Sequence, residues 1–200
     1  MAHTARAAES TLLARMVCAD FVSVDNGILG CDGNHVAVQT HLAGLPARWA
    51  VVLEDDAVVV PDFRVQLAAA LEVAPAPVVS LYLGRLRPPQ YQRQVVQAVA
   101  RANSVDASWI VGRRMLHAVG YAIRTDVLGS LLNFESRLPA DERVSAWAGG
   151  VAYCWPSLVD HADLPTVVQH RDRQPRPPGR TAYRVGGRDV WTERSVPLNA

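Results

Sequence analysis

Residues 49–63 have the sequence WAVVLEDDAVVVPDF, in which three consecutive acids separate two apolar runs. The first run, residues 51–53, is aliphatic and β-branched, which predicts a buried strand. A continuous apolar run is typical of a strand covered on both faces, as in a parallel sheet. The acids Glu54, Asp55 and Asp56 would then follow the carboxyl end of the strand, where open α/β sheets bind ligands.

The three carboxylates together indicate a cation site. Their mutual repulsion is relieved when a cation binds, and carboxylate oxygens suit Mg²⁺ or Mn²⁺. Such an ion could hold the phosphates of a nucleotide. Alternation along an extended segment would place Glu54 and Asp56 on the same side. The alternative is an acidic turn that caps the following element.

Composition excludes several classes of function. The 200 residues suit one domain, and half of them are apolar. A net charge of +1 gives no overall field for nucleic acid or a membrane surface. All 20 basic residues are arginine, which excludes a Schiff-base or P-loop lysine. No apolar run reaches the roughly 18 residues of a membrane span, and no signal peptide is visible.

The three cysteines are widely spaced and form no CxxC pair, so the sequence predicts neither a zinc site nor a disulfide framework. We therefore expect a reduced, cytoplasmic protein.

Predicted strands and helices alternate, which indicates the α/β class. We expect a mostly parallel central sheet flanked by helices, with a truncated first strand because only Met-Ala-His precedes the first helix. The predicted helices span residues 4–17, 34–42, 63–72, 125–132 and 141–147, and Tyr91, Val95 and Val99 indicate a further helix after Pro88-Pro89. The predicted strands span residues 20–24, 51–53, 78–83, 107–111, 118–123 and 151–155.

The composition changes near residue 170. We expect a domain over residues 1–170 and an Arg/Pro/Gly-rich tail over residues 171–200 with little core of its own. Seven arginines in the tail are interleaved with Tyr183 and Trp191. This pattern could bind phosphates, an acidic acceptor or nucleic acid, although the net charge does not favour nucleic acid. The alternatives are a solvated tail or one that packs across a neighbour.

Several stretches together resemble glycosyltransferase family 25, whose members include lipopolysaccharide and collagen-modifying sugar transferases. The acidic stretch resembles the hallmark of that family. LGCDGNHVAVQTHL resembles its glycine-cysteine, serine-histidine and helix segment, with Asn34 in place of the serine. HAVGYAIRTDVLGSLL, PADERVSAWA and YCWPSLVDHADLPTVV resemble the later segments in order and spacing, across residues 5–168.

The resemblance implies a GT-A-like fold with a nucleotide-binding α/β sheet, in a chain shorter than typical members. It implies transfer of a sugar from a nucleotide-sugar donor, with Mn²⁺ or Mg²⁺ on the diphosphate. The acceptor, a glycan, protein or other molecule, stays undefined. Asp56 is the first choice for the metal ligand. Glu54 or Asp55 would hold the ribose, the metal or a ligating water.

Four further positions gain expected roles from the resemblance. Arg6 resembles an arginine that faces the nucleotide. His35 either contacts a phosphate or has a structural role. His161, or its neighbour Asp160, would complete the metal shell, with a surface loop as the alternative.

For an inverting transfer the acceptor hydroxyl needs a general base. Asp141 and Glu142 occupy the family's acidic segment, and Asp141 is the better candidate. The alternative is that Asp141 caps its helix.

Two other functions fit the same acids. A shortened relative could bind a nucleotide sugar or glycan without catalysis. A metal-dependent phosphoryl-transfer hydrolase could use the acids, but two-metal enzymes gather further carboxylates from other segments, and here the remaining acids are scattered.

Overall fold

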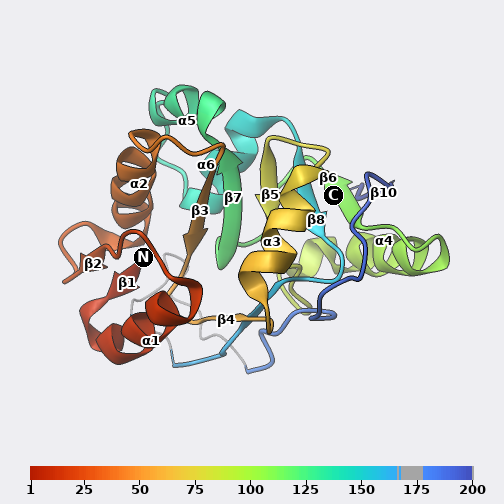
Figure 1. The fold of residues 1–200 in the computed structure, drawn as a ribbon, viewed down its shortest axis with the longest axis horizontal. Coiled ribbons are helices and arrows are strands. Elements are labelled where there is room, and N and C mark those ends of the chain that lie inside the picture. The colour runs from red at the N-terminus through yellow and green to blue at the C-terminus, as the bar shows by residue number, and fades with distance from the viewer. Residues whose placement is uncertain (166, 168–177, 200) are drawn as a thin grey trace.

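The computed structural model describes residues 1–165, 167 and 178–199 and confirms the α/β class. Figure 1 shows a central sheet with helices on both faces. The strands are β1 Ala2–His3, β2 Val24–Asp25, β3 Trp49–Leu53, β4 Ala57–Val59, β5 Val78–Ser80, β6 Trp109–Gly112, β7 Gly120–Arg124, β8 Val151–Cys154, β9 Val159–His161 and β10 Ser195–Pro197. The helices are η1 Thr4–Arg6, α1 Ala7–Val17, α2 Gly30–Ala43, α3 Phe63–Glu72, η2 Pro89–Tyr91, α4 Gln92–Ser104, α5 Thr125–Leu132 and α6 Ala140–Ala148.

The central sheet has the strand order β10-β6-β8-β5-β7-β3. The expectation of a mostly parallel sheet is wrong, because β3 and β5 both run antiparallel to β7, and β6 runs antiparallel to β8. Only the β5–β8 and β6–β10 pairs of this sheet are parallel. The apolar run in β3 reflects its position at the sheet edge, where helices cover both faces, and not a parallel neighbour.

Alternation along the strands divides the core into two layers. In β3, Val52 packs with the cluster that contains residues of α2, α5 and α6. Its neighbour Val51 packs with the cluster that contains residues of α1 and α3. Tyr121 and Ala122 of β7 divide in the same way. Period-two alternation therefore sends successive side chains into opposite layers, and the domain is a three-layer sandwich.

Helix α2 begins earlier than expected. The sequence predicts a helix capped by Asn34, but α2 starts at Gly30. The Asp25 carboxylate accepts hydrogen bonds from the backbone N–H groups of Leu29 (2.9 Å) and Gly30 (2.9 Å), which have no partner within the helix. Asn34 is instead buried inside the helix and donates to the Ala2 carbonyl at 3.1 Å. The predicted bounds of α3 and α5 are confirmed.

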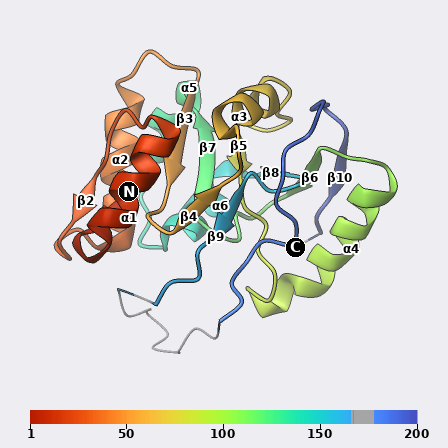
Figure 2. The ribbon, with the colours of Figure 1, turned by 60° about the horizontal axis from the view of Figure 1, so that its bottom comes forward.

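A short antiparallel ribbon lies beside the main sheet. It pairs β4 with β9 and places Ala57 opposite His161. Both strands lie together below the sheet in Figure 2. The Ala162 N–H continues the ladder to the Asp56 carbonyl at 2.8 Å. This ribbon therefore brings the acidic turn after β3 against a segment a hundred residues later in the chain.

The described part of the expected tail belongs to the core. β10 adds a parallel edge strand beside β6. Trp191, Val196 and Leu198 are buried, and Trp191 lies against Trp109 with ring centroids 5.7 Å apart. Apolar residues are sparse in this segment, but several of them pack against the domain, whereas Val185 and Val190 are exposed. Composition alone did not indicate this packing.

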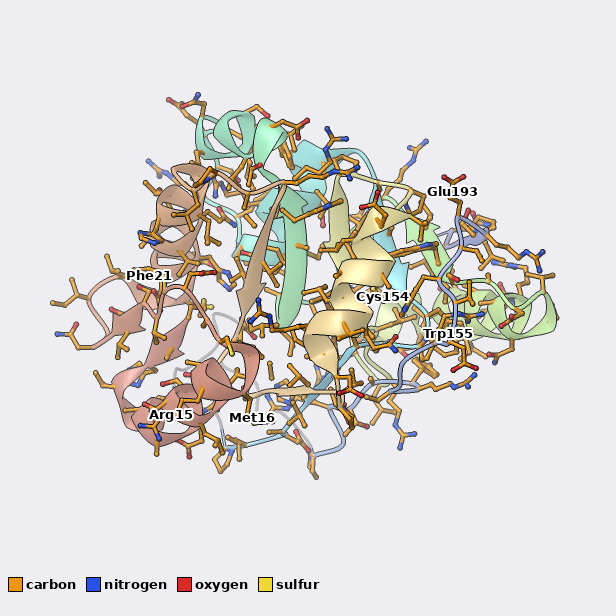
Figure 3. The ribbon with its side chains drawn as sticks, in the orientation of Figure 1. Arg15, Met16, Phe21, Cys154, Trp155 and Glu193 are labelled. Carbon is orange, nitrogen blue, oxygen red and sulfur yellow. The ribbon has the colours of Figure 1, made fainter. Side chains whose placement is uncertain are left out.

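Helix α1 exposes part of its surface to solvent, whereas the strands behind α3 are buried. Figure 3 shows Arg15 and Met16 projecting from α1 at the outside of the molecule, whereas Cys154 lies behind α3. Cys154 is fully buried in β8, and Cys18 and Cys31 are exposed residues. No helix in the described part of the chain is both long and apolar enough to cross a bilayer.

Candidate functional site

The acids after β3 form a tight turn. The Ala57 N–H donates to the Glu54 carbonyl at 3.1 Å, and the Glu54 N–H donates to the Val119 carbonyl at 2.9 Å. The expectation that Glu54 and Asp56 share one side is therefore wrong, because a turn replaces the extended backbone that alternation requires. Asp55 and Asp56 meet on one side, whereas Glu54 bonds to a residue of α2.

Arg6 lies between the two aspartates. Its Nη1 donates to Asp55 Oδ1 at 2.8 Å and to Asp56 Oδ2 at 2.6 Å, and its Nη2 donates to the Pro165 carbonyl at 2.8 Å. Burial opposes the charge of Arg6, but the carboxylates of Asp56 and Asp55 outweigh it and raise the pKa of the guanidinium. Arg6 was expected to face a nucleotide. In the structure its guanidinium instead neutralises charge on Asp55 and Asp56. The Met1 ammonium is a second cation near these acids, because it interacts with the charges of Glu54 and Asp55, although burial lowers its pKa.

The second oxygen of Asp56 is the unusual atom of this site. Asp56 is only 9% exposed, and its Oδ1 is buried with no hydrogen-bond partner among the described residues. A buried carboxylate oxygen without a partner carries a desolvation penalty of about 1–3 kcal/mol or more. By contrast, both oxygens of Asp55 are satisfied, because its Oδ2 accepts from the His3 N–H at 2.8 Å. A cation bound at Asp56 Oδ1 would therefore offset the desolvation penalty of this oxygen.

His161 orients Asp56. Its Nδ1 accepts a hydrogen bond from the Asp163 N–H at 2.8 Å, so a neutral ring carries its proton on Nε2. That Nε2 lies 3.4 Å from Asp56 Oδ2. The alternative candidate, Asp160, uses its Oδ1 to accept from the N–H groups of His161 and Ala182. His161 is thus brought to the acids as expected, but its lone pair faces Asp163 and not a metal position.

A divalent ion could be bound here by a single protein carboxylate. Mg²⁺ in proteins is bound by one or two carboxylates, with waters and substrate phosphates as the other ligands. Asp56 Oδ1 can supply the protein oxygen. Asp55 and His161, expected as further ligands, are committed to Arg6, His3 and Asp56. They support the Asp56 carboxylate.

A second cluster lies on the other side of the turn. His35 Nε2 is 3.2 Å from Glu54 Oε1, and His35 Nδ1 is 2.9 Å from the Tyr121 hydroxyl. The Cys31 sulfur, a His35 nitrogen and a Glu54 oxygen all lie within 4.8 Å of one another. His35 is 1% exposed and both ring nitrogens have partners, so its arrangement favours the structural role over a phosphate contact.

The sequence contained a signal for this cluster. Cys31 and His35 are four residues apart and share a helix face. Because the sequence prediction began the helix at Asn34, it placed Cys31 outside the helix and did not indicate that Cys31 and His35 lie on one face. Desolvation and the surrounding charges of Glu54 and Asp32 raise the pKa of the Cys31 thiol to about 12. The Cys31 thiol is therefore protonated at neutral pH, beside the Glu54 carboxylate.

Asp141 lies in the electrostatic range of this cluster. Desolvation raises its pKa to about 6, the negative charges of Glu142 and Glu54 add to the effect, and the hydrogen bond from the Glu142 N–H opposes it. Asp141 Oδ1 accepts that bond at 2.9 Å in the first turn of α6. Glu142 itself is exposed. A carboxylate with a pKa near 6 suits proton transfer near neutral pH, which favours Asp141 as the base.

One cavity borders the acidic turn, and another lies beside His35. One of about 210 Å³ is bordered by Asp55 and is otherwise mostly apolar, with Leu13, Phe21, Val38, Leu53 and Phe63 among its walls. Another, of about 300 Å³, is more polar and is bordered by Asp32, His35, Glu135, Ser136 and Arg143. Tyr121 and Trp109 contribute to neither, because both are fully buried in the core.

Three arginines of the expected tail bond to other groups of the same chain. Arg180 pairs with Asp163 at 2.7 Å, Arg188 pairs with Asp106, and Arg194 donates to the Val105 carbonyl at 2.8 Å. Such pairing takes these side chains away from an external phosphate. Arg171, Arg173 and Arg176 lie outside the described residues.

Neither the protein-family models nor the curated proteins compared with this chain match it. The likeness to glycosyltransferase family 25 therefore remains a resemblance of motifs.

Proposed function

We propose that this protein is a divalent-cation-dependent glycosyltransferase that takes a sugar from a nucleotide-sugar donor. The observation that carries the proposal is the buried Asp56 Oδ1 after β3, which has no hydrogen-bond partner among the described residues. The order of the motifs resembling glycosyltransferase family 25 supports the same function and a GT-A-like arrangement.

The bound ion supplies Lewis-acid stabilisation of the leaving nucleoside diphosphate. Asp56 holds the ion through Oδ1, and Mn²⁺ and Mg²⁺ both suit that oxygen. Arg6 lowers the repulsion between the aspartates by donating to both of them, and the His161 ring packs against the Asp56 carboxylate with Nε2 3.4 Å from Oδ2. The apolar cavity beside Asp55 would take the flat face of the nucleoside base.

Asp141 accepts the proton of the acceptor hydroxyl in this proposal. Its raised pKa of about 6 leaves it ionised at neutral pH and able to accept a proton. The acceptor itself stays open. We place the reaction in the cytoplasm as part of the proposal, because Cys18, Cys31 and Cys154 are free thiols.

The test is release of nucleoside diphosphate from a panel of UDP-, GDP- and other sugar nucleotides, with Mn²⁺ or Mg²⁺ and with chelator. We expect metal-dependent release from one donor, lowered at least 100-fold in Asp56→Asn and unchanged in Glu72→Gln, whose exposed carboxylate only pairs with Arg48. Release that persists in Asp56→Asn or in chelator would contradict the proposal. Donor binding by calorimetry with no release would favour a binding module instead.

A further inference from the structure

A hydrogen-bond chain runs from α6 through the core to the acidic turn. Arg143 Nη1 donates to Gln39 Oε1 at 3.3 Å, and Gln39 Nε2 donates to the Tyr121 hydroxyl at 2.9 Å. Tyr121 bonds to His35 Nδ1 at 2.9 Å, and His35 Nε2 bonds to Glu54 Oε1 at 3.2 Å. The first four side chains are at most 8% exposed. The sequence did not predict this connection, since its members come from four separate elements.

Arg143 sets the direction of the whole chain. A guanidinium can only donate, so the Gln39 oxygen must face it and the Gln39 amide nitrogen must face Tyr121. The Tyr121 hydroxyl therefore accepts from Gln39, and its own proton has His35 Nδ1 as the acceptor. Burial raises the pKa of Tyr121, which keeps that proton in place. His35 is left with its proton on Nε2, directed at Glu54.

The reverse arrangement is costly at two positions. If His35 Nδ1 carried the proton, Tyr121 would accept twice and its buried O–H would have no acceptor among the described residues. His35 Nε2 would then present a lone pair to the Glu54 carboxylate. An unsatisfied buried donor costs about 1–3 kcal/mol, and the contact between two acceptors adds to this.

We propose that Gln39, Tyr121 and His35 are positioning residues that hold Glu54 Oε1 through a hydrogen-bond chain of fixed polarity. The chain fixes one oxygen of Glu54, which is about one-fifth exposed, and leaves Oε2 without a hydrogen bond among the described residues. The chain thereby gives the Glu54 carboxylate a defined orientation at the start of the acidic turn. This role of Glu54 toward a donor rests on the proposed function, but the polarity of the chain does not.

The same polarity excludes a competing interpretation of Cys31, His35 and Glu54 as a zinc-type site. A metal on His35 would require the Nε2 lone pair, and the other ring nitrogen would have to donate its proton. In this chain Nε2 carries the proton and Nδ1 accepts. The spacing of the three ligand atoms suits a metal, but the tautomer does not.

The first test locates the protons of His35 by ¹⁵N–¹H correlation on histidine-labelled full-length protein. We expect protonated Nε2 and unprotonated Nδ1 in the wild type. Gln39→Glu offers an acceptor oxygen to both Arg143 and Tyr121, so the Tyr121 proton turns away and His35 Nδ1 becomes protonated. Gln39→Met, which removes the link without reversing it, is the control and leaves Nδ1 unprotonated.

A wild-type His35 with protonated Nδ1, or a Gln39→Glu variant with unchanged Nδ1, would overturn the proposal. Co²⁺ gives an independent check through its thiolate charge-transfer absorption. We expect no such band in the wild type. A band that is lost both in Cys31→Ser and in His35→Ala but kept in Cys18→Ser would also overturn it, because Cys31 and His35 would then be ligands.

The consequence for function is measured separately. Tyr121→Phe and Gln39→Met should raise the KM for the donor about tenfold or more, with a smaller change in kcat, because supporting residues typically contribute 10–100-fold. An unchanged KM would refute the positioning role. If no donor turns over even in the wild type, the proposed function fails, whereas the tautomer and Co²⁺ measurements still decide the polarity.

Discussion

Three residues that are distant in the chain, Arg6, Asp56 and His161, define the site at the scale of single side chains. The sequence indicated all three, the acid from its place after a strand and the other two from a resemblance. It did not indicate that Arg6 would bridge the aspartates or that the His161 lone pair would be used by Asp163. Those outcomes depend on long-range contacts that no spacing along the chain encodes.

Asp141 provides a prediction at this scale. Its folded pKa is raised to about 6 by desolvation, so the ionised form is disfavoured in the fold. The resulting loss of stability begins as the pH rises above the ordinary aspartate pKa and is complete above pH 6. Asp141→Asn should therefore raise the melting temperature by a few degrees at pH 8, with a smaller gain at pH 4, as measured by calorimetry.

The same variant should lose transferase turnover by roughly 10²–10⁴-fold, because the general base is removed. A residue that stabilises the fold when replaced and is needed for activity is typical of a functional site. Glu142→Gln, at an exposed neighbouring position, is the matched control. A destabilised or fully active Asp141→Asn protein would refute the assigned role.

Helix α2 shows how an element boundary changes the chemistry that a sequence predicts. Its start at Gly30, and not near Asn34, places Cys31 on the same face as His35. The boundary depends on the Asp25 carboxylate, which lies five residues upstream and accepts from two free N–H groups. The sequence prediction looked for a cap directly before the helix, so it missed a cap that β2 supplies. By contrast α3, with apolar residues at regular spacing, was predicted within its bounds.

Asp25→Ala should destabilise the first turn of α2, because it removes the carboxylate that accepts hydrogen bonds from the Leu29 and Gly30 N–H groups. The hydrogen bonds from Leu29 and from the neighbouring N–H groups lower the pKa of Asp25, so its contribution is present above the ordinary aspartate pKa and is lost as the pH falls through the lowered value. We expect a melting temperature lower by a few degrees at pH 7, together with faster amide exchange over residues 29–32. Asp20→Ala, at an exposed position, serves as the control. Unchanged exchange would show that α2 needs no cap.

At the scale of the molecule, the α/β class followed from the alternation of elements, but the direction of the strands did not. The continuous apolar run of β3 predicted a parallel neighbour, whereas burial by helices on both faces of an edge strand gives the same pattern. The C-terminal segment was the other difference. Its sparse apolar residues suggested a tail. In the structure β10 forms the edge strand of the sheet beside β6, and Trp191 is buried against the domain.

Trp191→Ala tests whether this segment stabilises the whole domain. Trp191 is 7% exposed, packs on Trp109 and donates to Gln66 Oε1 at 2.9 Å. Removal of a buried tryptophan costs about 3–5 kcal/mol, and about 1 kcal/mol shifts the melting temperature of a domain of this size by roughly 2–4 °C. We expect a fall of roughly 10 °C, against little change in Val190→Ala, which is 67% exposed. A small effect would mark the segment as an independent tail.

The most direct test of the account is Mn²⁺ binding, followed by the loss of the free Mn²⁺ signal in electron paramagnetic resonance with a nucleoside diphosphate present. Wild type and Glu72→Gln should bind one ion with equal affinity, and Asp56→Asn should bind at least tenfold more weakly, because the charge on the buried Oδ1 is gone. Equal affinity in Asp56→Asn would contradict the assignment of Asp56 Oδ1 as the ligand oxygen.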